Sequence, residues 1–143
     1  MSICKGSYYI VKIKSLKRII DKAAEADIPV LCFIDEVLRG TNTLERIASS
    51  SKILECIADA NAVCFAATHD LELAKILSGR FDNYHFEEKV EENNVVFDYK
   101  LRKGTTKTRN AIKLLEMIGY NQQITKGAEK AARFFLENGF WTV

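Results

Sequence analysis

The sequence has little proline and glycine, an almost balanced charge and no long apolar run. One proline and seven glycines among 143 residues exclude collagen-like and low-complexity chains. The 21 Lys and Arg residues exceed the 19 Asp and Glu residues by only two, so we expect no strong attraction of the whole molecule to nucleic acid or membranes. No apolar run approaches the ~20 residues of a membrane helix, and residues 1–7 lack the apolar core of a signal peptide. We therefore expect a cytoplasmic protein with no membrane partner.

The cysteines and histidines are too few and too scattered to form a metal-binding or disulfide pattern. The four cysteines show no CxxC spacing, and only two histidines are present. Cys32 and Cys64 lie inside apolar runs, where reduced thiols pack as small hydrophobic groups. Apolar residues make up 48% of the chain, which predicts one modest core without a disulfide framework.

Apolar patterns in the first half of the chain predict alternating strands and helices. Residues 8–13 (YYIVKI) favour a short strand or the lead-in to the next helix, for which Ser15 is the expected N-cap. Two short, continuously apolar runs, 30–34 and 62–67, are typical of parallel strands buried on both faces. A helix over about 44–60 separates them. This order predicts an α/β fold with a parallel sheet.

The second half of the chain predicts a β-hairpin followed by two helices. Asp70 is the expected N-cap of a short helix over 71–77. Apolar and polar residues alternate over 84–101 around a turn at 92–94, and this alternation places His85 on the outer face, without an assigned role. The last two helices are each expected to end at a glycine: 109–118 before Gly119, and 125–138 before Gly139.

Two acids at the end of the first apolar strand form a candidate site. Residues 31–36 (LCFIDE) match the Walker B pattern, in which a buried strand delivers carboxylates to the sheet edge where ligands collect in open α/β folds. In that pattern Asp35 would hold Mg²⁺ through water, and Glu36 would polarise the attacking water. The alternative interpretation is a pair of solvated residues that open a loop.

Three further segments lie in register with this acid pair. RGTNT (39–43) follows it directly, a second apolar strand ends in ATHD (67–70), and GSYYIVKIKSLKRII (6–20) precedes it. With these segments the chain resembles the ATPase domain of the MutS family of DNA mismatch-repair proteins, over roughly residues 3–125. The resemblance implies part of a P-loop NTPase fold of the ABC type.

The resemblance also implies roles for individual residues. Asp35 and Glu36 become the Walker B pair, and His69 becomes the switch histidine beside the γ-phosphate. Ser7 matches the signature serine, which in this family reaches the nucleotide held by the opposite subunit. The loop that faces that other subunit contains Thr41, Asn42 and Thr43. The implied cofactors are ATP and Mg²⁺, and the implied partners are a second copy of the chain and, through the parent protein, DNA. Without the resemblance, Ser7 is interpreted as a turn cap and His69 as a structural histidine.

The same resemblance predicts how the chain is organised. It separates residues 1–108, the C-terminal part of the ATPase domain, from residues 109–143, a helix-turn-helix dimerisation element. It pairs 62–67 in parallel with 30–34 and leaves the other edge of 62–67 to the hairpin or to a second copy. No GxxxxGK[ST] segment occurs, so the phosphate-binding loop and its lysine are missing from this sequence. Lys12 stands where the family pattern leads us to expect a glutamate.

Three functions remain open from the sequence. The first is half of a DNA-dependent ATPase that works as a dimer, and the second is a dimerising interaction module without activity. The third is an unrelated α/β nucleotide-binding fold in which the acid pair is coincidental. The missing phosphate-binding loop favours the second function for this chain and the first for the parent protein.

Overall fold

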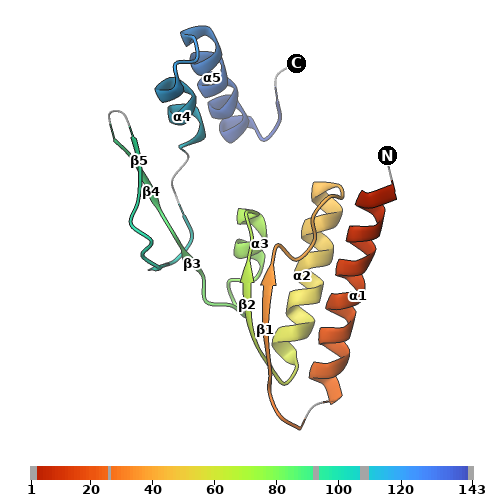
Figure 1. Cartoon of the computed structure of the whole chain (residues 1–143). Helices are drawn as coiled ribbons and strands as arrows, with labels where there is room; N and C mark the ends of the chain where they lie inside the picture. Colours follow the sequence, from red (N-terminus) through yellow and green to blue (C-terminus); the bar gives the residue numbers. More distant parts are fainter. Residues whose placement is uncertain (1–2, 26, 92–93, 107–109, 142–143) are drawn as a thin grey trace. The chain divides into compact units, whose positions relative to one another are not determined.

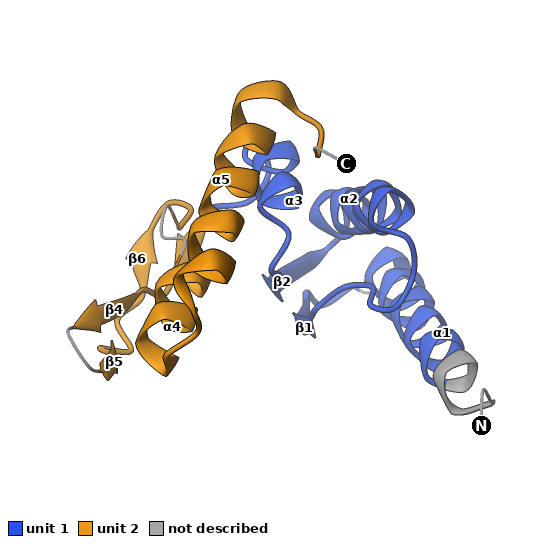
Figure 2. Cartoon of the chain, turned by 90° about the horizontal axis from the view of Figure 1, so that it is seen from above, with its two compact units in different colours: residues 1–83 blue, residues 84–143 orange. Residues whose placement is uncertain are grey.

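The computed structural model describes residues 3–25, 27–91, 94–106 and 110–141. The architecture is mixed α/β, and the chain divides into two compact units, Met1–Asn83 (unit 1) and Tyr84–Val143 (unit 2) (Figure 2). Among the described residues, no helix is both long and apolar enough to cross a membrane. The predicted functional division between residues 108 and 109 stays a prediction.

Unit 1 begins with one long helix, α1 (Ile3–Glu25). Residues 8–13 belong to this helix, so the strand alternative is wrong and the helical one is confirmed. Ser15 lies inside α1 and is not its N-cap. Packing explains why α1 includes residues 8–13. Tyr9 extends the apolar stripe of Leu16 by two turns and packs against the core. This packing outweighs the local strand preference of the β-branched residues.

The two predicted strands form a parallel pair. β1 (Val30–Asp35) and β2 (Ala62–Ala67) lie in register from Val30 opposite Ala62 to Asp35 opposite Ala67, which confirms the predicted pairing. Helix α2 (Thr43–Asp59) connects them. Among the described residues this sheet has two strands (Figure 1).

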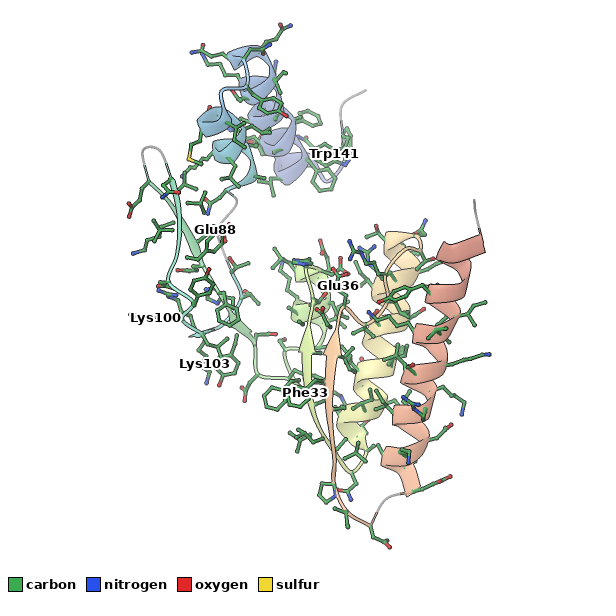
Figure 3. All side chains as sticks on the ribbon, viewed as in Figure 1. Phe33, Glu36, Glu88, Lys100, Lys103 and Trp141 are labelled. Carbon is green, nitrogen blue, oxygen red and sulfur yellow. The ribbon has the colours of Figure 1, made fainter. Side chains whose placement is uncertain are left out.

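The hydrophobic core of unit 1 lies on one face of this sheet. There α1 and α2 pack side by side, and α3 (Leu71–Ile76) packs against α2 (Figure 1, Figure 2). The buried core residues are Leu16, Cys32, Ile34, Val37, Leu38, Leu54, Ile57, Leu73 and Leu77. The opposite face carries the exposed side chains of Leu31, Phe33, Val63 and Phe65, of which Figure 3 labels Phe33. The expectation that both faces are buried is therefore wrong for the described residues.

The described cysteines, Cys32, Cys56 and Cys64, are free thiols. Cys32 and Cys64 are register partners in the sheet. Burial, with a smaller contribution from a hydrogen bond with Cys32, raises the pKa of Cys64 to about 12. Because the thiolate is the reactive form, Cys64 is an inert packing residue at neutral pH.

We expect the exposed sheet face of unit 1 to drive association of the chain. The rings of Phe33 and Phe65 stack with centroids 5.3 Å apart and form an apolar patch that water contacts directly. The double variant Phe33→Lys, Phe65→Lys should therefore lower the sedimentation coefficient measured at tens of micromolar. Ile28→Lys is the matched control, because Ile28 is exposed but precedes the sheet. A wild-type chain that sediments as a 16.2 kDa monomer would contradict this prediction.

Unit 2 begins with the predicted hairpin, which consists of two short antiparallel strand pairs. β4 (Glu88–Glu91) pairs with β5 (Asn94–Phe97), and β3 (Tyr84–His85) pairs with β6 (Arg102–Lys103). The hairpin is thus confirmed. Two residues of the predicted turn, 92–93, lie outside the described residues.

The alternation of side chains is opposite to the predicted one at residues 84–87, whereas around Val90 and Val95 it is as predicted. Tyr84 and Phe86 are exposed, whereas His85 is half-buried. The imidazole of His85 is held at both nitrogens: Nε2 lies 3.0 Å from Glu87 Oε1, and Nδ1 lies 2.8 Å from the carbonyl oxygen of Gly104. Polar partners, which sequence alternation does not reveal, therefore determine this orientation.

This arrangement predicts that the β3–β6 pair loosens as the pH rises. Both imidazole nitrogens of His85 face hydrogen-bond acceptors, so the doubly protonated ring fits this site best. The hydrogen bonds to Glu87 and to the carbonyl oxygen of Gly104 raise the pKa of His85, and the nearby Arg102 opposes this shift. The contribution of His85 is therefore complete below its unfolded pKa of about 6.5 and is lost as the pH rises through the folded pKa. Amide exchange of β6 measured by NMR, corrected for intrinsic rates, should increase across that pH range. The same profile in His85→Gln would contradict the assignment.

Two helices complete unit 2, α4 (Ala111–Ile118) and α5 (Gln122–Asn138). Gly119 and Gly139 take left-handed conformations, φ 93° and 79°, which confirms both predicted C-caps. α5 begins three residues earlier than predicted, because the Asn121 side chain accepts a hydrogen bond from the Ile124 amide and caps it. Arg109, the predicted start of the preceding helix, lies outside the described residues.

Candidate active site

The carboxyl ends of β1 and β2 bring the two predicted catalytic residues together. The Glu36 amide donates to the Ala67 carbonyl at 2.9 Å and so extends the parallel ladder by one residue. As a result Glu36, directly after β1, and His69, two residues after β2, lie at the same sheet edge. Figure 3 labels Glu36 at this edge. His69 Nε2 lies 3.6 Å from Glu36 Oε1.

Glu36 has an unusual backbone conformation. Its φ of 48° lies in the left-handed region, which non-glycine residues rarely adopt and which is enriched at functional sites. Its side chain is 27% exposed, and its second carboxylate oxygen, Oε2, lies 3.4 Å from Arg39 Nε. The carboxylate is thus placed between an imidazole and a guanidinium at the carboxyl end of β1.

A cavity of about 170 Å³ adjoins this pair. Residues from the end of β1, the start of α2 and the segment after β2 surround it, and its lining includes Glu36, Arg39, Arg46, Thr68, His69 and Asp70. Carboxylates, guanidinium groups, an imidazole and a hydroxyl therefore share one concave surface. Such a convergence of polar groups in a cleft is typical of a catalytic or binding site.

An ion pair between Arg46 and Asp70 is the part of this site that the sequence analysis missed. Arg46 Nε donates to Asp70 Oδ2 at 2.9 Å, and Arg46 Nη2 donates to Asp70 Oδ1 at 2.8 Å. These bonds hold the pKa of Asp70 below its ordinary value and raise the pKa of Arg46, although burial opposes both shifts. Asp70 occupies the N-cap position of α3, which confirms the predicted position, but its side chain makes no capping hydrogen bond. Its carboxylate binds Arg46 instead.

The remaining predicted site residues have identifiable local contacts. Asn42 is the N-cap of α2 and accepts a hydrogen bond from the Leu44 amide at 2.9 Å. The Thr41 hydroxyl lies 3.4 Å from Glu45 Oε2, and Thr43 is the first residue of α2. Ser7 belongs to α1, but its side chain lies outside the described part of the structure. The roles of these residues toward a nucleotide stay predictions.

Asp35 ends β1 with an exposed side chain, while its backbone carbonyl accepts a hydrogen bond from Lys12 Nζ at 2.6 Å. In the part of the chain that the structure describes, no cluster of three His, Cys, Asp or Glu side chains forms a metal site. Proteins commonly hold Mg²⁺ with one or two carboxylates, water and substrate phosphates. The exposed carboxylate of Asp35 is an oxygen donor of the kind that such an ion takes, and its role toward Mg²⁺ stays a prediction.

Comparison with known protein families shows to which family the chain belongs. The model of MutS domain V matches residues 2–135. The chain belongs to the MutS domain V family. This confirms the family resemblance that the sequence motifs predicted.

Two relatives of this MutS domain V chain show the extent of the similarity. It is 26% identical over 122 residues to a DNA mismatch repair protein MutS from Thermus thermophilus, a match that covers 85% of the chain and 15% of that protein. It is 31% identical over 127 residues to a DNA mismatch repair protein MutS from Natronomonas pharaonis, with 87% of the chain and 14% of that protein covered. The chain thus spans about one-seventh of the length of these relatives.

Proposed function

We propose that this MutS domain V chain carries the Walker B and switch-histidine half of an ATP-hydrolysis site in a DNA-repair ATPase. The observation that carries the proposal is the meeting of Glu36 and His69, 3.6 Å apart, at the carboxyl ends of two parallel strands. Ligands of open α/β folds bind at this sheet edge. The β1–α2–β2 unit is accordingly part of a P-loop NTPase fold, and a phosphate-binding segment outside this sequence completes the site.

In the proposed reaction Glu36 orients the attacking water and accepts its proton at the carboxylate. The partly buried position of the Glu36 side chain and its left-handed backbone fix that carboxylate at the sheet edge. His69 stands beside the γ-phosphate and donates a hydrogen bond to the charge that develops there. Asp35 would hold Mg²⁺ through water, and the ion would supply positive charge that neutralises the phosphates.

The proposed site also needs a second subunit. Ser7 on α1 reaches the nucleotide held by the other copy, the loop that contains Thr41, Asn42 and Thr43 faces that copy across the composite site, and residues 109–143 contribute to dimerisation. The exposed apolar residues of α4 and α5 support this last assignment, among them Ile118, Ile124 and Leu136. DNA binding belongs to the longer parent protein.

The proposal predicts that ATP turnover depends on a phosphate-binding loop. The chain alone should show no turnover, because it lacks the backbone amides and the lysine that hold the β- and γ-phosphates. A joined protein, in which a segment with a phosphate-binding loop precedes residues 1–143, should bind Mg-ATP and hydrolyse it. Steady hydrolysis by the purified chain that disappears in Glu36→Gln would contradict the first expectation. A joined protein that folds but neither binds nor hydrolyses ATP would contradict the proposed function.

A second candidate function is a dimerising module without catalysis. It is favoured by the aromatic cluster at the end of α5, where Phe135 stacks on Trp141 at 4.4 Å and Trp141 remains exposed. Under this alternative the joined protein would dimerise equally well with and without Mg-ATP. Sedimentation in the presence and absence of the nucleotide separates the two functions.

A further inference from the structure

The ion pair between Arg46 and Asp70 has the geometry of a clamp rather than of a solvated surface contact. It is bidentate, with two donor–acceptor distances of 2.8 and 2.9 Å, and the two side chains are only 23% and 20% exposed. A planar guanidinium that binds both oxygens of a carboxylate fixes orientation as well as distance. The pair joins residues 24 positions apart in the sequence, so it constrains the tertiary structure.

The Arg46–Asp70 ion pair fixes the side chain of Asp70, which directly follows His69 in the chain. The side chain of His69 is 92% exposed, so packing does little to fix its position. Its two neighbours are anchored instead: the Asp70 amide donates to the Thr68 hydroxyl at 3.0 Å, and the Asp70 carboxylate is held by Arg46. The position of the imidazole beside Glu36 therefore depends on the anchoring of Asp70.

The other end of the clamp lies in the first turn of α2. Asn42 caps this helix, and the Arg46 amide donates to the Asn42 carbonyl at 2.9 Å. The loop 39–43 leads directly into the same turn. A shift of that loop is thus transmitted through Arg46 to Asp70.

The clamp also neutralises a carboxylate close to the imidazole. Asp70 directly follows His69 in the chain, and without Arg46 its carboxylate would be a second hydrogen-bond acceptor for the imidazole besides Glu36. The guanidinium of Arg46 occupies both oxygens of Asp70. This leaves Glu36 as the carboxylate that faces Nε2 of His69, at 3.6 Å.

We propose that Arg46 is a positioning residue that, through Asp70, holds His69 beside Glu36 and couples His69 to the loop 39–43. This inference rests on the proposed function, because the reaction it serves is the ATP hydrolysis proposed above. Arg46 does not act on the substrate itself. It links the loop assigned to the facing subunit with the assigned switch histidine, so binding of a second copy would change the position of His69.

NMR on the 143-residue chain tests the clamp without any nucleotide. In Arg46→Met the pKa of the Asp70 carboxyl should return toward the usual value of about 3.9. Exchange of the Asp70 amide should become about tenfold faster, which corresponds to the loss of one hydrogen bond to a charged group. The nuclear Overhauser contact between the imidazole of His69 and the side chain of Glu36 should disappear.

Two further variants make the result specific. Arg46→Lys keeps the positive charge but loses the planar fork, so the pKa of Asp70 should stay low while the contact between His69 and Glu36 weakens. Arg80→Met is the matched control, because Arg80 also pairs with a distant aspartate, Asp59, away from the cavity. Arg80→Met should leave the pKa of Asp70, the exchange of the Asp70 amide and the contact between His69 and Glu36 unchanged. If Arg46→Met does not fold, the test rests on the contact between His69 and Glu36 in Arg46→Lys compared with the wild-type chain.

The outcome that would overturn the inference is a raised pKa of Asp70 with an unchanged contact between His69 and Glu36. Kinetics of the joined protein give a second test: Arg46→Met should lower kcat by at least about tenfold and leave KM within about twofold. Normal kcat in this variant would also overturn the inference. A wild-type joined protein without ATP hydrolysis would instead overturn the proposed function, and the NMR result would still decide the role of Arg46.

Discussion

Replacing Glu36 with glutamine in the joined protein is expected to slow ATP hydrolysis by about 10²–10⁴-fold, the usual contribution of a general base or water-orienting group. The amide keeps the size and the partial burial of the side chain but cannot accept the proton of the attacking water. ATP binding should remain, because the phosphates are held by the phosphate-binding loop and by Mg²⁺. Single-turnover kinetics together with an equilibrium binding assay measure the two quantities separately.

Glu55→Gln is the matched control for this experiment. Glu55 is 26% exposed, against 27% for Glu36, and it pairs with Lys52 on α2 away from the cavity. The same chemical change there should leave hydrolysis unaltered. His69→Ala should also slow hydrolysis, since the imidazole is the nearest polar group to Glu36 Oε1 that the sequence motif identifies. Unchanged hydrolysis in Glu36→Gln would rule out the role assigned to this residue.

The central part of unit 1 could be predicted from the sequence because its signals are local. The two continuous apolar runs are short, bounded by polar residues and separated by one helical segment, and only parallel strands fit that pattern well. The structure accordingly has β1 and β2 at the predicted residues. The position of Glu36 beside His69 follows from the same order, since residues at the carboxyl ends of parallel neighbours share one sheet edge.

Other features depend on tertiary contacts and could not be predicted in this way. The strand preference of residues 8–13 is local, whereas the helix there is stabilised by packing of Tyr9 against the core. Continuous apolarity indicated burial of both sheet faces, yet only one face of β1 and β2 packs against the helices. The sequence does not reveal which segments cover a strand, so the exposure of Phe33 had no local signal.

The clamp of Arg46 on Asp70 shows the same limit within the site. Asp70 is the last residue of the ATHD motif, and Arg46 lies three residues after the RGTNT motif. Each has an ordinary local interpretation, Arg46 as a solvated helix residue and Asp70 as an N-cap. Only the fold brings the two side chains together, and the pairing then takes the carboxylate away from the cap position. An acid within one motif and a base just after the other, where the two motifs meet at one sheet edge, are the signal that would have suggested the pair.

The largest effect on stability is expected from Ile57→Ala. Ile57 lies in α2 with no exposed surface and packs in the core of unit 1. Truncation to alanine removes buried methyl and methylene groups and leaves a cavity, which costs about 2–5 kcal/mol of the free energy of unfolding. A unit of this size has a total stability of about 4–12 kcal/mol, so the variant should lose a large share of it and unfold at a clearly lower urea concentration. Urea denaturation followed by far-UV circular dichroism measures the change.

Leu44→Ala on the same helix separates burial from helix propensity. Leu44 is 78% exposed, and its truncation should change the free energy of unfolding by no more than about 0.5 kcal/mol. Alanine favours helices slightly more than isoleucine does, by a few tenths of a kcal/mol, so propensity opposes the predicted loss in Ile57→Ala and cannot produce it. Ile57→Val should fall between the two variants, at about 0.5–1.5 kcal/mol. Similar losses for Leu44→Ala and Ile57→Ala would show that α2 does not pack with Ile57 in the core, and the sheet edge that carries Glu36 and His69 would then lose its structural support.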